Sequence, residues 1–255
     1  MCSIVVASRV WAQWPLVVAA NRDESLQRPS EGPTVRAVGD TTMLGPRDLQ
    51  AGGSWLGLNA HGVFVGITNR FAPGLSGQTF PGSRGQLVLD ALSQATAGEA
   101  AARIDDISPG QQGPFHLITA DRDGAALRWS DTTELTGGPL RPGFHILTER
   151  SFDAAPTQRE PHLAQSLEAF RSDPLPPMAD WVAQWRALLS RHDDQAFEGT
   201  CVHAPDRGYG TRSTTVLMLG ADGRTHFFYA DGPPCVTPLV EQVAGVAALE
   251  RRPGG

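Results

Sequence analysis

The sequence predicts an α+β fold in which helices pack over antiparallel β-sheets. Short apolar segments recur in pairs around turn-forming residues, as in hairpins, and three segments carry apolar residues at helical spacing. There is neither a βαβ alternation nor a glycine-rich nucleotide turn, which argues against a doubly wound sheet. The 255 residues, of which 40% are hydrophobic, suffice for a large core, and we expect a single domain over residues 1–255.

Hairpins account for the expected strands. The first one pairs the β-branched segment 2–9 with the apolar segment 16–20. Three further hairpins are expected, each across a turn containing Gly, Asn or Asp: 54–58 with 63–68, 115–120 with 125–129, and 214–220 with 225–230. These hairpins occur in both the N-terminal and the C-terminal parts of the chain. We therefore expect both parts to contribute strands to antiparallel sheets.

Helices are expected between these blocks of strands. Apolar residues lie three or four positions apart in 84–97, 162–171 and 178–190, the last of which contains Trp181 and Trp185. Gly52-Gly53 and the proline-rich segment 173–177 are expected to be loops.

The charge of the chain excludes some classes of partner. It has 21 basic residues, all of them arginine, against 27 acidic ones, for a net charge of −6. An acidic chain without a basic run is not expected to bind nucleic acid or an anionic membrane surface. The apolar N-terminal residues are interrupted by Arg9, Gln13 and Arg22, so we expect neither a signal peptide nor an integral membrane segment.

The cysteines favour a reducing compartment. Cys2, Cys201 and Cys235 are odd in number and form no CxxC pair, which argues against a disulfide framework and a zinc knuckle. The seven histidines form neither HExxH nor CxxCH, so no metal site is expected. We therefore expect a soluble, cytoplasmic protein that needs no cofactor for catalysis.

Cys2 is the leading candidate for a nucleophile. Small residues after an initiator methionine generally permit its removal, which would leave one residue with both a thiol and a free α-amine. An amine with a pKa of about 7.7–8.0 can accept the thiol proton near neutrality. The alternative, which stays open, is a small buried residue at the start of an edge strand.

The first hairpin brings charged residues toward this thiol. A turn centred near residue 12 pairs positions whose numbers sum to about 24, so Asn21, Arg22 and Asp23 return opposite Cys2. A carboxylate can orient the α-amine, and an arginine can lower the thiol pKa. A solvated strand end with an Arg–Asp ion pair is the competing interpretation.

Four ordered motifs resemble the NRDE family, also called the transport and Golgi organisation protein 2 family. These motifs are Met1-Cys2, Asn21-Arg22-Asp23-Glu24, Gly52-Gly53-Ser54-Trp55-Leu56-Gly57 and Gly208-Tyr209-Gly210-Thr211-Arg212. The resemblance extends to about Tyr229. It implies a four-layer αββα sandwich of the N-terminal-nucleophile hydrolase type, with choloylglycine hydrolases and penicillin V acylases as analogues.

The same resemblance implies a set of catalytic residues. By position, Cys2 is the nucleophile, Asp23 the carboxylate near its amine, and Asn69 an oxyanion donor. Arg212 resembles the arginine that completes the acylase constellation, or else forms an ion pair that pins the glycine-rich turn. The sequence departs from the pattern where Glu149 follows Thr148, because an asparagine is expected there and a glutamate offers no amide donor.

Two functions follow as hypotheses. One is a cysteine-dependent hydrolase or acyltransferase acting on a non-peptide amide or acyl compound, with Asn21 and Arg22 beside the thiol. The other is a non-catalytic carrier of haem or lipid, which the resemblance implies, with Arg22, Arg70 and Arg212 facing a propionate or phosphate. Trp55 either binds a flat ligand or fills the core. A role in secretory organisation rests on the family name alone.

Overall fold

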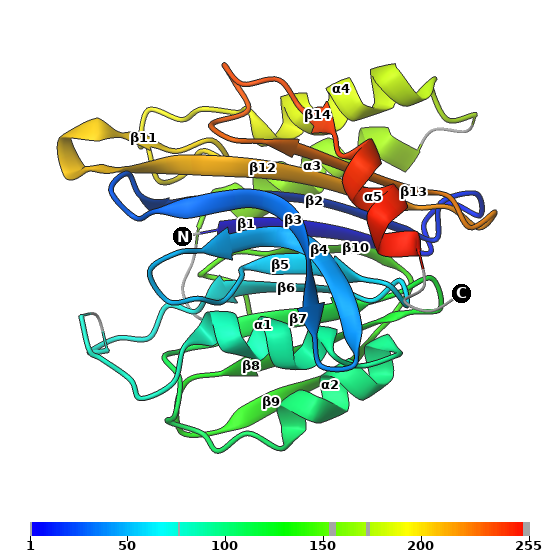
Figure 1. Ribbon diagram of the computed structural model, residues 1–255. Helices are drawn as coiled ribbons and strands as arrows, with labels where there is room; N and C mark the ends of the chain where they lie inside the picture. Colours follow the sequence, from blue (N-terminus) through cyan, green and yellow to red (C-terminus); the bar gives the residue numbers. More distant parts are fainter. Residues whose placement is uncertain (1, 76, 153–156, 172–173, 252–255) are drawn as a thin grey trace.

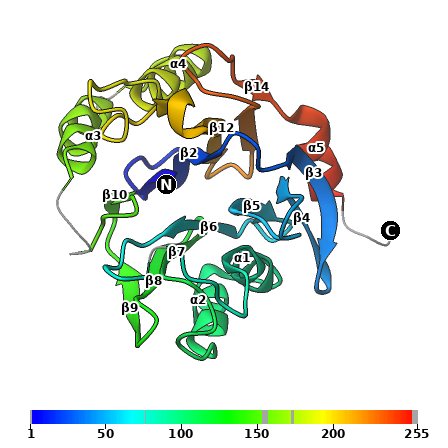
Figure 2. The same ribbon diagram turned by 90° about the vertical axis from the view of Figure 1, so that its left-hand side faces the viewer.

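The computed structural model describes residues 2–75, 77–152, 157–171 and 174–251. Two seven-stranded antiparallel sheets lie face to face, with helices on both outer sides (Figures 1 and 2). The view in Figure 2 shows the four layers in cross-section, with α3 and α4 on one side and α1 and α2 on the other. The predicted αββα sandwich is confirmed.

The first sheet combines strands from the N-terminal and C-terminal parts of the chain. Its order is β10 (Gly143–Leu147), β1 (Cys2–Ser8), β2 (Leu16–Ser25), β12 (Tyr209–Leu219), β13 (Thr225–Ala230) and β14 (Val240–Glu241), and β11 (His203–Ala204) pairs with β12. The central strands β1, β2 and β12 are almost fully buried because both of their faces are covered.

The second sheet is formed by consecutive strands. Its order is β3 (Ser30–Val38), β4 (Thr41–Asp48), β5 (Leu56–Asn59), β6 (Phe64–Asn69), β7 (Phe115–Ala120), β8 (Ala125–Ser130) and β9 (Leu135–Leu140). Sequential pairing of this kind needs only short turns, apart from the segment between β6 and β7, which contains two helices.

The helices cover the outer faces. On the second sheet lie α1 (Arg84–Leu92) and α2 (Ala97–Asp105), and over the first lie α3 (Arg159–Leu167), the short 3-10 helix η1 (Glu168–Arg171) and α4 (Met178–Leu189). A second 3-10 helix, η2 (Pro205–Arg207), precedes β12, and α5 (Val243–Glu250) contacts β3, β4 and β13. None of the helices in the described ranges has the length and apolarity needed to cross a bilayer.

Two hydrophobic clusters hold the layers together. One fills the space between the sheets and under α1 and α2, and includes Ile4, Val18 and Phe64. The other joins the first sheet to α3 and α4 through aromatic rings, with Trp11 edge-on to Trp181 at 5.0 Å between ring centroids. Alternate residues of β1 supply the two clusters, as the period of a strand requires.

The predicted elements differ from the observed ones mainly in extent. The helix expected over 84–97 is two helices, because Ser93 caps α1 and Thr96 begins α2 with a capping box. The segments of β3, β4, β9 and β10 were not predicted as strands, since prolines and glycines interrupt their alternation. The expected loop at 173–177 begins outside the described residues.

Two glycines bring the loop before β5 against the start of α1. A Cβ added to Gly53 would lie 2.4 Å from the backbone carbon of Gly85, and Ser54 donates its backbone N–H to Gly85 at 3.2 Å. The Gly52 backbone has φ +77°, a conformation that favours glycine. This close approach, which needs glycine at position 53, places Arg84 beside the Gly52–Gly57 motif.

We expect Gly53→Ala to destabilise the fold by about 1–3 kcal/mol, because backbone rather than a flexible side chain occupies the space of the new methyl group. Urea unfolding measures the change. Gly124→Ala is the matched control, since its added Cβ meets nothing within 4 Å, and we expect it to alter stability by no more than about 0.5 kcal/mol. Equal effects of the two replacements would contradict this account of the Gly53–Gly85 approach.

Candidate active site around Cys2

The β1–β2 register places Cys2 directly opposite Arg22 and Ser3 opposite Asn21. The paired numbers sum to 24, so the predicted register is confirmed. Directly opposed residues point to the same face of a sheet, and Cys2 and Arg22 share the face of Ile4 and Ala20, which lies between the two sheets. Ser3 and Asn21 point the other way, toward α3 and α4.

The Cys2 thiol lies in a polar environment at the start of β1. The residue is half-buried, and the backbone N–H of Asp23 donates to its sulfur. Burial raises the pKa of the Cys2 thiol, and the nearby Asp23 carboxylate raises it further, whereas Arg22 opposes the rise. A thiol whose pKa is raised needs a base before it can attack.

Asp23 is held by partners from two distant segments. Thr211 donates its hydroxyl to Asp23 Oδ1 at 2.6 Å, and an Arg159 Nη1 lies 3.6 Å from Oδ2. Tyr209 donates its hydroxyl to the Asp23 backbone carbonyl at 2.6 Å. Burial raises the pKa of the Asp23 carboxyl, and the Arg159 guanidinium lowers it in part. The carboxylate is thus fixed in place next to the start of β1.

Arg159 connects this carboxylate to Glu149. Its guanidinium is almost completely buried, lies 3.8 Å from Glu149 Oε2, and donates to Ser3 Oγ at 3.1 Å and to the Phe197 carbonyl at 2.5 Å. Glu149 follows β10, whose register pairs Leu147 with Ile4 of β1, and its negative charge helps to raise the pKa of the Asp23 carboxyl. Glu149 therefore lies at the site, as a charged partner of Arg159 and not as an amide donor.

Arg22 and Trp55 form one wall of the site. The Arg22 guanidinium stacks over the Trp55 ring at 4.2 Å from its centroid, and Nη2 lies 3.8 Å from Glu24. Arg22 Nη1 is buried and has no hydrogen-bond partner among the described residues. A buried, unsatisfied cationic donor is costly, so this N–H is suited to an acceptor atom of a ligand. Trp55 is itself 8% exposed and belongs to the core, so it supports Arg22 from within the layers.

Arg84 and Tyr209 also belong to the surroundings of Cys2, although sequence reasoning gave them only structural roles. The first residue of α1, Arg84, is close enough to interact with the Cys2 and Glu24 charges, and burial lowers its pKa. Burial raises the pKa of Tyr209, with Cys2 and Asp23 adding to the shift. Arg84 and Tyr209 lie far apart in the sequence, and only the fold brings each of them near Cys2.

Asn69 is exposed at the end of β6. Its neighbours tie this end to the segment after β10, since Thr68 donates to the Thr148 carbonyl at 3.4 Å and the Phe71 N–H donates to the Glu149 carbonyl at 2.7 Å. Asn69 therefore lies at the same end of the sandwich as Cys2. Its role as an oxyanion donor stays a prediction.

Three other predicted residues have structural partners away from the thiol. Asn21 donates to the Leu189 and Thr200 carbonyls and accepts from Thr214, all on the helical side of the sheet. Arg70 donates to the Ser151 and Phe152 carbonyls and stacks over Trp129. Arg212 donates to the Ser25 and Leu26 carbonyls. The arginines of the carrier hypothesis, Arg22, Arg70 and Arg212, thus have separate sets of partners, and Asn21 faces away from Cys2.

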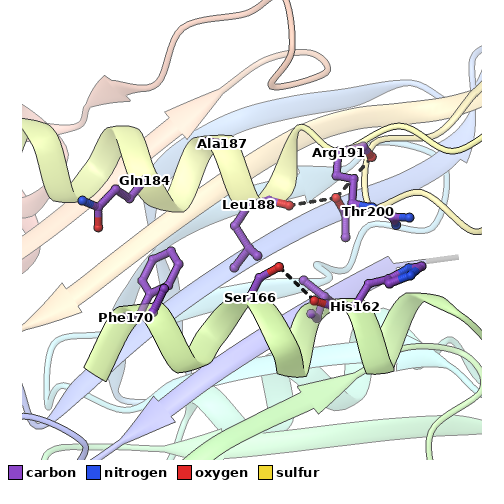
Figure 3. Close-up of a pocket in the computed structure, with 10 residues that line it drawn as sticks. His162, Ser166, Phe170, Gln184, Ala187, Leu188, Arg191 and Thr200 are labelled. Atoms are coloured by element: carbon purple, nitrogen blue, oxygen red, sulfur yellow. Dashed lines mark hydrogen bonds between the residues drawn. The ribbon is translucent and has the colours of Figure 1, made fainter. Parts of the chain in front are cut away.

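A separate pocket of about 420 Å³ lies between α3 and α4 (Figure 3). Leu163, Phe170 and Leu188 give it apolar walls, and His162 and Arg191 also line it. Figure 3 shows His162 and Phe170 on one helical segment, Leu188 on the facing helix and Arg191 just beyond the end of that helix. His162 Nδ1 is buried without a hydrogen-bond partner among the described residues. The volume falls within the range of small-molecule sites.

A family model described as "Transport and Golgi organisation 2" matches residues 1–230. The chain belongs to this family. Among the curated Transport and Golgi organisation 2 proteins, the homologues from Bos taurus and Homo sapiens are each 25% identical to the chain over 237 and 240 residues. Each alignment covers 83% of this chain and 84% of the relative. The resemblance carried by the four motifs is confirmed.

Solved structures show which fold this family member has. An N-acylethanolamine-hydrolysing acid amidase orthologue from Caenorhabditis elegans matches with a TM-score of 0.54 at 15% identity, over 85% of this chain and 92% of the other. A conjugated bile acid hydrolase variant from Clostridium perfringens matches with a TM-score of 0.56 at 10% identity, over 99% and 95%. At these identities the likeness establishes the N-terminal-nucleophile hydrolase fold and says nothing about activity.

Proposed function

We propose that this protein is an N-terminal-cysteine hydrolase or acyltransferase acting on a non-peptide amide or acyl compound. The observation that carries the proposal is the placement of the half-buried Cys2 thiol opposite Arg22, whose Nη1 has no partner among the described residues, and beside the fixed carboxylate of Asp23. A structural cysteine at a strand end needs neither a buried cation nor a held carboxylate.

The chemistry requires removal of Met1, which lies outside the described residues. The freed α-amine of Cys2 accepts the thiol proton, and the sulfur attacks the substrate carbonyl carbon. The C–N or C–O bond of the tetrahedral intermediate then breaks, and the protonated amine donates its proton to the leaving group. Water or an acyl acceptor cleaves the resulting thioester, which restores the thiol.

The charges of the residues around Cys2 suggest different roles for them. Arg22 Nη1 and the amide of Asn69 are the donors proposed for the oxyanion, while Asp23 orients the terminal amine. Glu149 supplies negative charge where an amide is expected, and its partner Arg159 offsets that charge. We infer that the reacting end of the substrate is uncharged, since an anionic group would meet both Asp23 and Glu149.

The structural neighbours support a substrate with an acyl group on a non-peptide partner. One is named for hydrolysis of N-acylethanolamines and the other for hydrolysis of conjugated bile acids. An apolar acyl chain with a small polar leaving group is accordingly the substrate class that we propose to test first.

Turnover of a panel of fluorogenic N-acyl amides and acyl esters tests the proposal. We expect Cys2→Ala to abolish turnover and Cys2→Ser to lower it by at least about 100-fold, because a hydroxyl is the weaker nucleophile at neutral pH. Circular dichroism establishes that both variants are folded. Undiminished turnover by the Cys2→Ala protein would exclude the proposed chemistry.

The pocket between α3 and α4 favours a second candidate function, the transport of a hydrophobic ligand. Its apolar walls suit a flat or aliphatic molecule, and Arg191 suits a propionate or carboxylate. An imidazole nitrogen of His162, buried and unpartnered among the described residues, is a potential axial ligand for haem iron. This candidate places the carried ligand apart from Cys2.

A haemin titration tests this second candidate. We expect a saturable Soret shift that His162→Ala abolishes, because the variant lacks the axial imidazole. His145→Ala is the matched control, since His145 lies in β10 and donates from Nε2 to the Arg141 carbonyl, outside the pocket. An identical Soret shift in both variants would place haem binding elsewhere and reject this pocket as its site.

A further inference from the structure

Two cysteines and two histidines meet on the side of the first sheet opposite the second sheet. His192, Cys201, His203 and Cys235 each bring one potential ligand atom to a cluster in which all four atoms lie within 4.8 Å of one another. Cys201 Sγ lies 3.4 Å from His203 Nε2 and 3.6 Å from Cys235 Sγ, and His203 Nε2 lies 3.3 Å from Cys235 Sγ. The cluster contains both cysteines other than Cys2.

Three of these separations, those among Cys201, Cys235 and His203, are close to the edges of a tetrahedral zinc site. With Zn–S bonds of about 2.3 Å and Zn–N bonds of about 2.05 Å, tetrahedral angles give S···S of about 3.8 Å and S···N of about 3.6 Å. The three distances among Cys201, Cys235 and His203 are each within a few tenths of an ångström of those values, and the ligand atom of His192 lies within 4.8 Å of the other three. A disulfide requires sulfur atoms about 2.05 Å apart and makes no use of the two histidines.

Contacts that do not involve the four candidate ligand side chains hold the ligand-bearing segments together. A Cβ added to Gly199 would lie 3.0 Å from both the Arg191 carbonyl oxygen and the Asp193 nitrogen, so the segments that carry His192 and Cys201 are in close contact. The Cys201 N–H donates to the Arg191 carbonyl at 3.0 Å, and Arg186 donates to the Pro234 carbonyl at 2.8 Å. The cluster is therefore not a chance meeting of flexible side chains.

We propose that His192, Cys201, His203 and Cys235 form a structural zinc site of the Cys₂His₂ type. Two thiolates and two imidazoles are a preferred ligand set for Zn²⁺ in a closed tetrahedral site. Each sulfur lies within 3.4 Å of the same imidazole nitrogen, so sulfur and nitrogen ligands share one ion. A two-iron cluster of the Rieske type instead binds its cysteines and histidines to different irons.

The ion would join three segments that are distant in the sequence: the residues after α4, those leading into β11, and those after β13. One of these segments also supports the candidate active site, because the Val202 N–H donates to Thr211 Oγ1 at 2.8 Å and Thr211 donates to Asp23. The bound ion would therefore stabilise the segment that holds Thr211, the hydrogen-bond donor to Asp23. The inference does not depend on the proposed activity.

Metal analysis of the untagged, full-length protein tests the proposal. We expect about one zinc per chain after dialysis and, in the metal-free protein, Co²⁺ spectra with tetrahedral visible bands and a sulfur-to-cobalt charge-transfer band. The double variant C201S/C235S is expected to bind zinc at least about 100-fold more weakly, since even outer-shell changes cost about 10–100-fold. Competition with a chromophoric chelator measures this affinity.

Controls separate this site from adventitious binding. C2S removes the remaining thiol and H61A removes an exposed histidine between β5 and β6, and both variants are expected to keep one zinc. Circular dichroism distinguishes loss of metal from loss of fold in C201S/C235S. Absence of a charge-transfer band, equal zinc affinity in C201S/C235S and the unaltered protein, or a Cys201–Cys235 disulfide in freshly reduced protein would each overturn the proposal.

Discussion

Replacing Arg159 with methionine is expected to lower the free energy of unfolding by about 3–5 kcal/mol, because one buried cation serves two carboxylates. Arg159 Nη1 lies between Asp23 and Glu149, and the same side chain bonds Ser3 and the Phe197 carbonyl. Methionine preserves much of the apolar stem but leaves both acids without their buried cation. Urea unfolding at neutral pH measures the difference.

Arg171→Met is the matched control for this replacement. Arg171 lies in η1, directly after α3, where its half-exposed side chain pairs with Glu168. An exposed pair contributes about 0–1 kcal/mol, so this variant is expected to keep nearly full stability. If Arg159→Met were no more destabilising than Arg171→Met, the proposed support of Asp23 by Arg159 would be wrong.

Asp23→Asn is expected to slow acylation of Cys2 by about 10²–10⁴-fold. The amide keeps the size of the side chain, and it retains an oxygen that accepts from Thr211, but it cannot hold the positive charge of the terminal amine. Single-turnover kinetics with an excess of enzyme over an activated acyl ester isolate the acylation step. Binding of the acyl chain should change little, because the replacement does not alter an apolar contact.

The pH profile adds a second readout for Asp23. Burial raises the pKa of this carboxyl, so the loss of acylation that protonation of Asp23 causes, below the fall that protonation of the α-amine causes, should begin at a higher pH than an ordinary carboxyl with a pKa of about 3.9 would give. In the Asp23→Asn protein, this Asp23-dependent fall in the acylation rate should be absent. Asp222→Asn replaces an exposed carboxylate and is expected to leave both rate and profile unchanged. A profile with an unchanged acidic limb in the Asp23→Asn protein would assign the limb to another group.

Local geometry made part of the site predictable from the sequence. A short turn fixes the register of a hairpin, so the pairing of Cys2 with Arg22 followed from counting residues on both sides of the turn. The layered fold followed in the same way from hairpins and amphipathic segments, because each depends on neighbours in the chain.

The rest depends on contacts between distant segments, which a residue pattern does not encode. Arg159 is a polar residue at the start of α3, and only docking of that helix on the first sheet buries it beside Asp23. The helical spacing of 84–97 likewise did not show that Arg84 lies near enough to Cys2 to interact with its charge. Spacing suggested no metal site, because the four clustered Cys and His residues come from three segments that only the tertiary fold unites.

The acyl-enzyme itself provides the most direct test of the central claim, that Cys2 is a nucleophile with a free amine. Intact-mass spectrometry after brief treatment with an activated acyl ester should show a chain lacking Met1 and carrying one acyl group, and peptide mapping should locate that group on Cys2. A chain that retains Met1, or acylation spread over Cys201 and Cys235 with Cys2 unmodified, would contradict it.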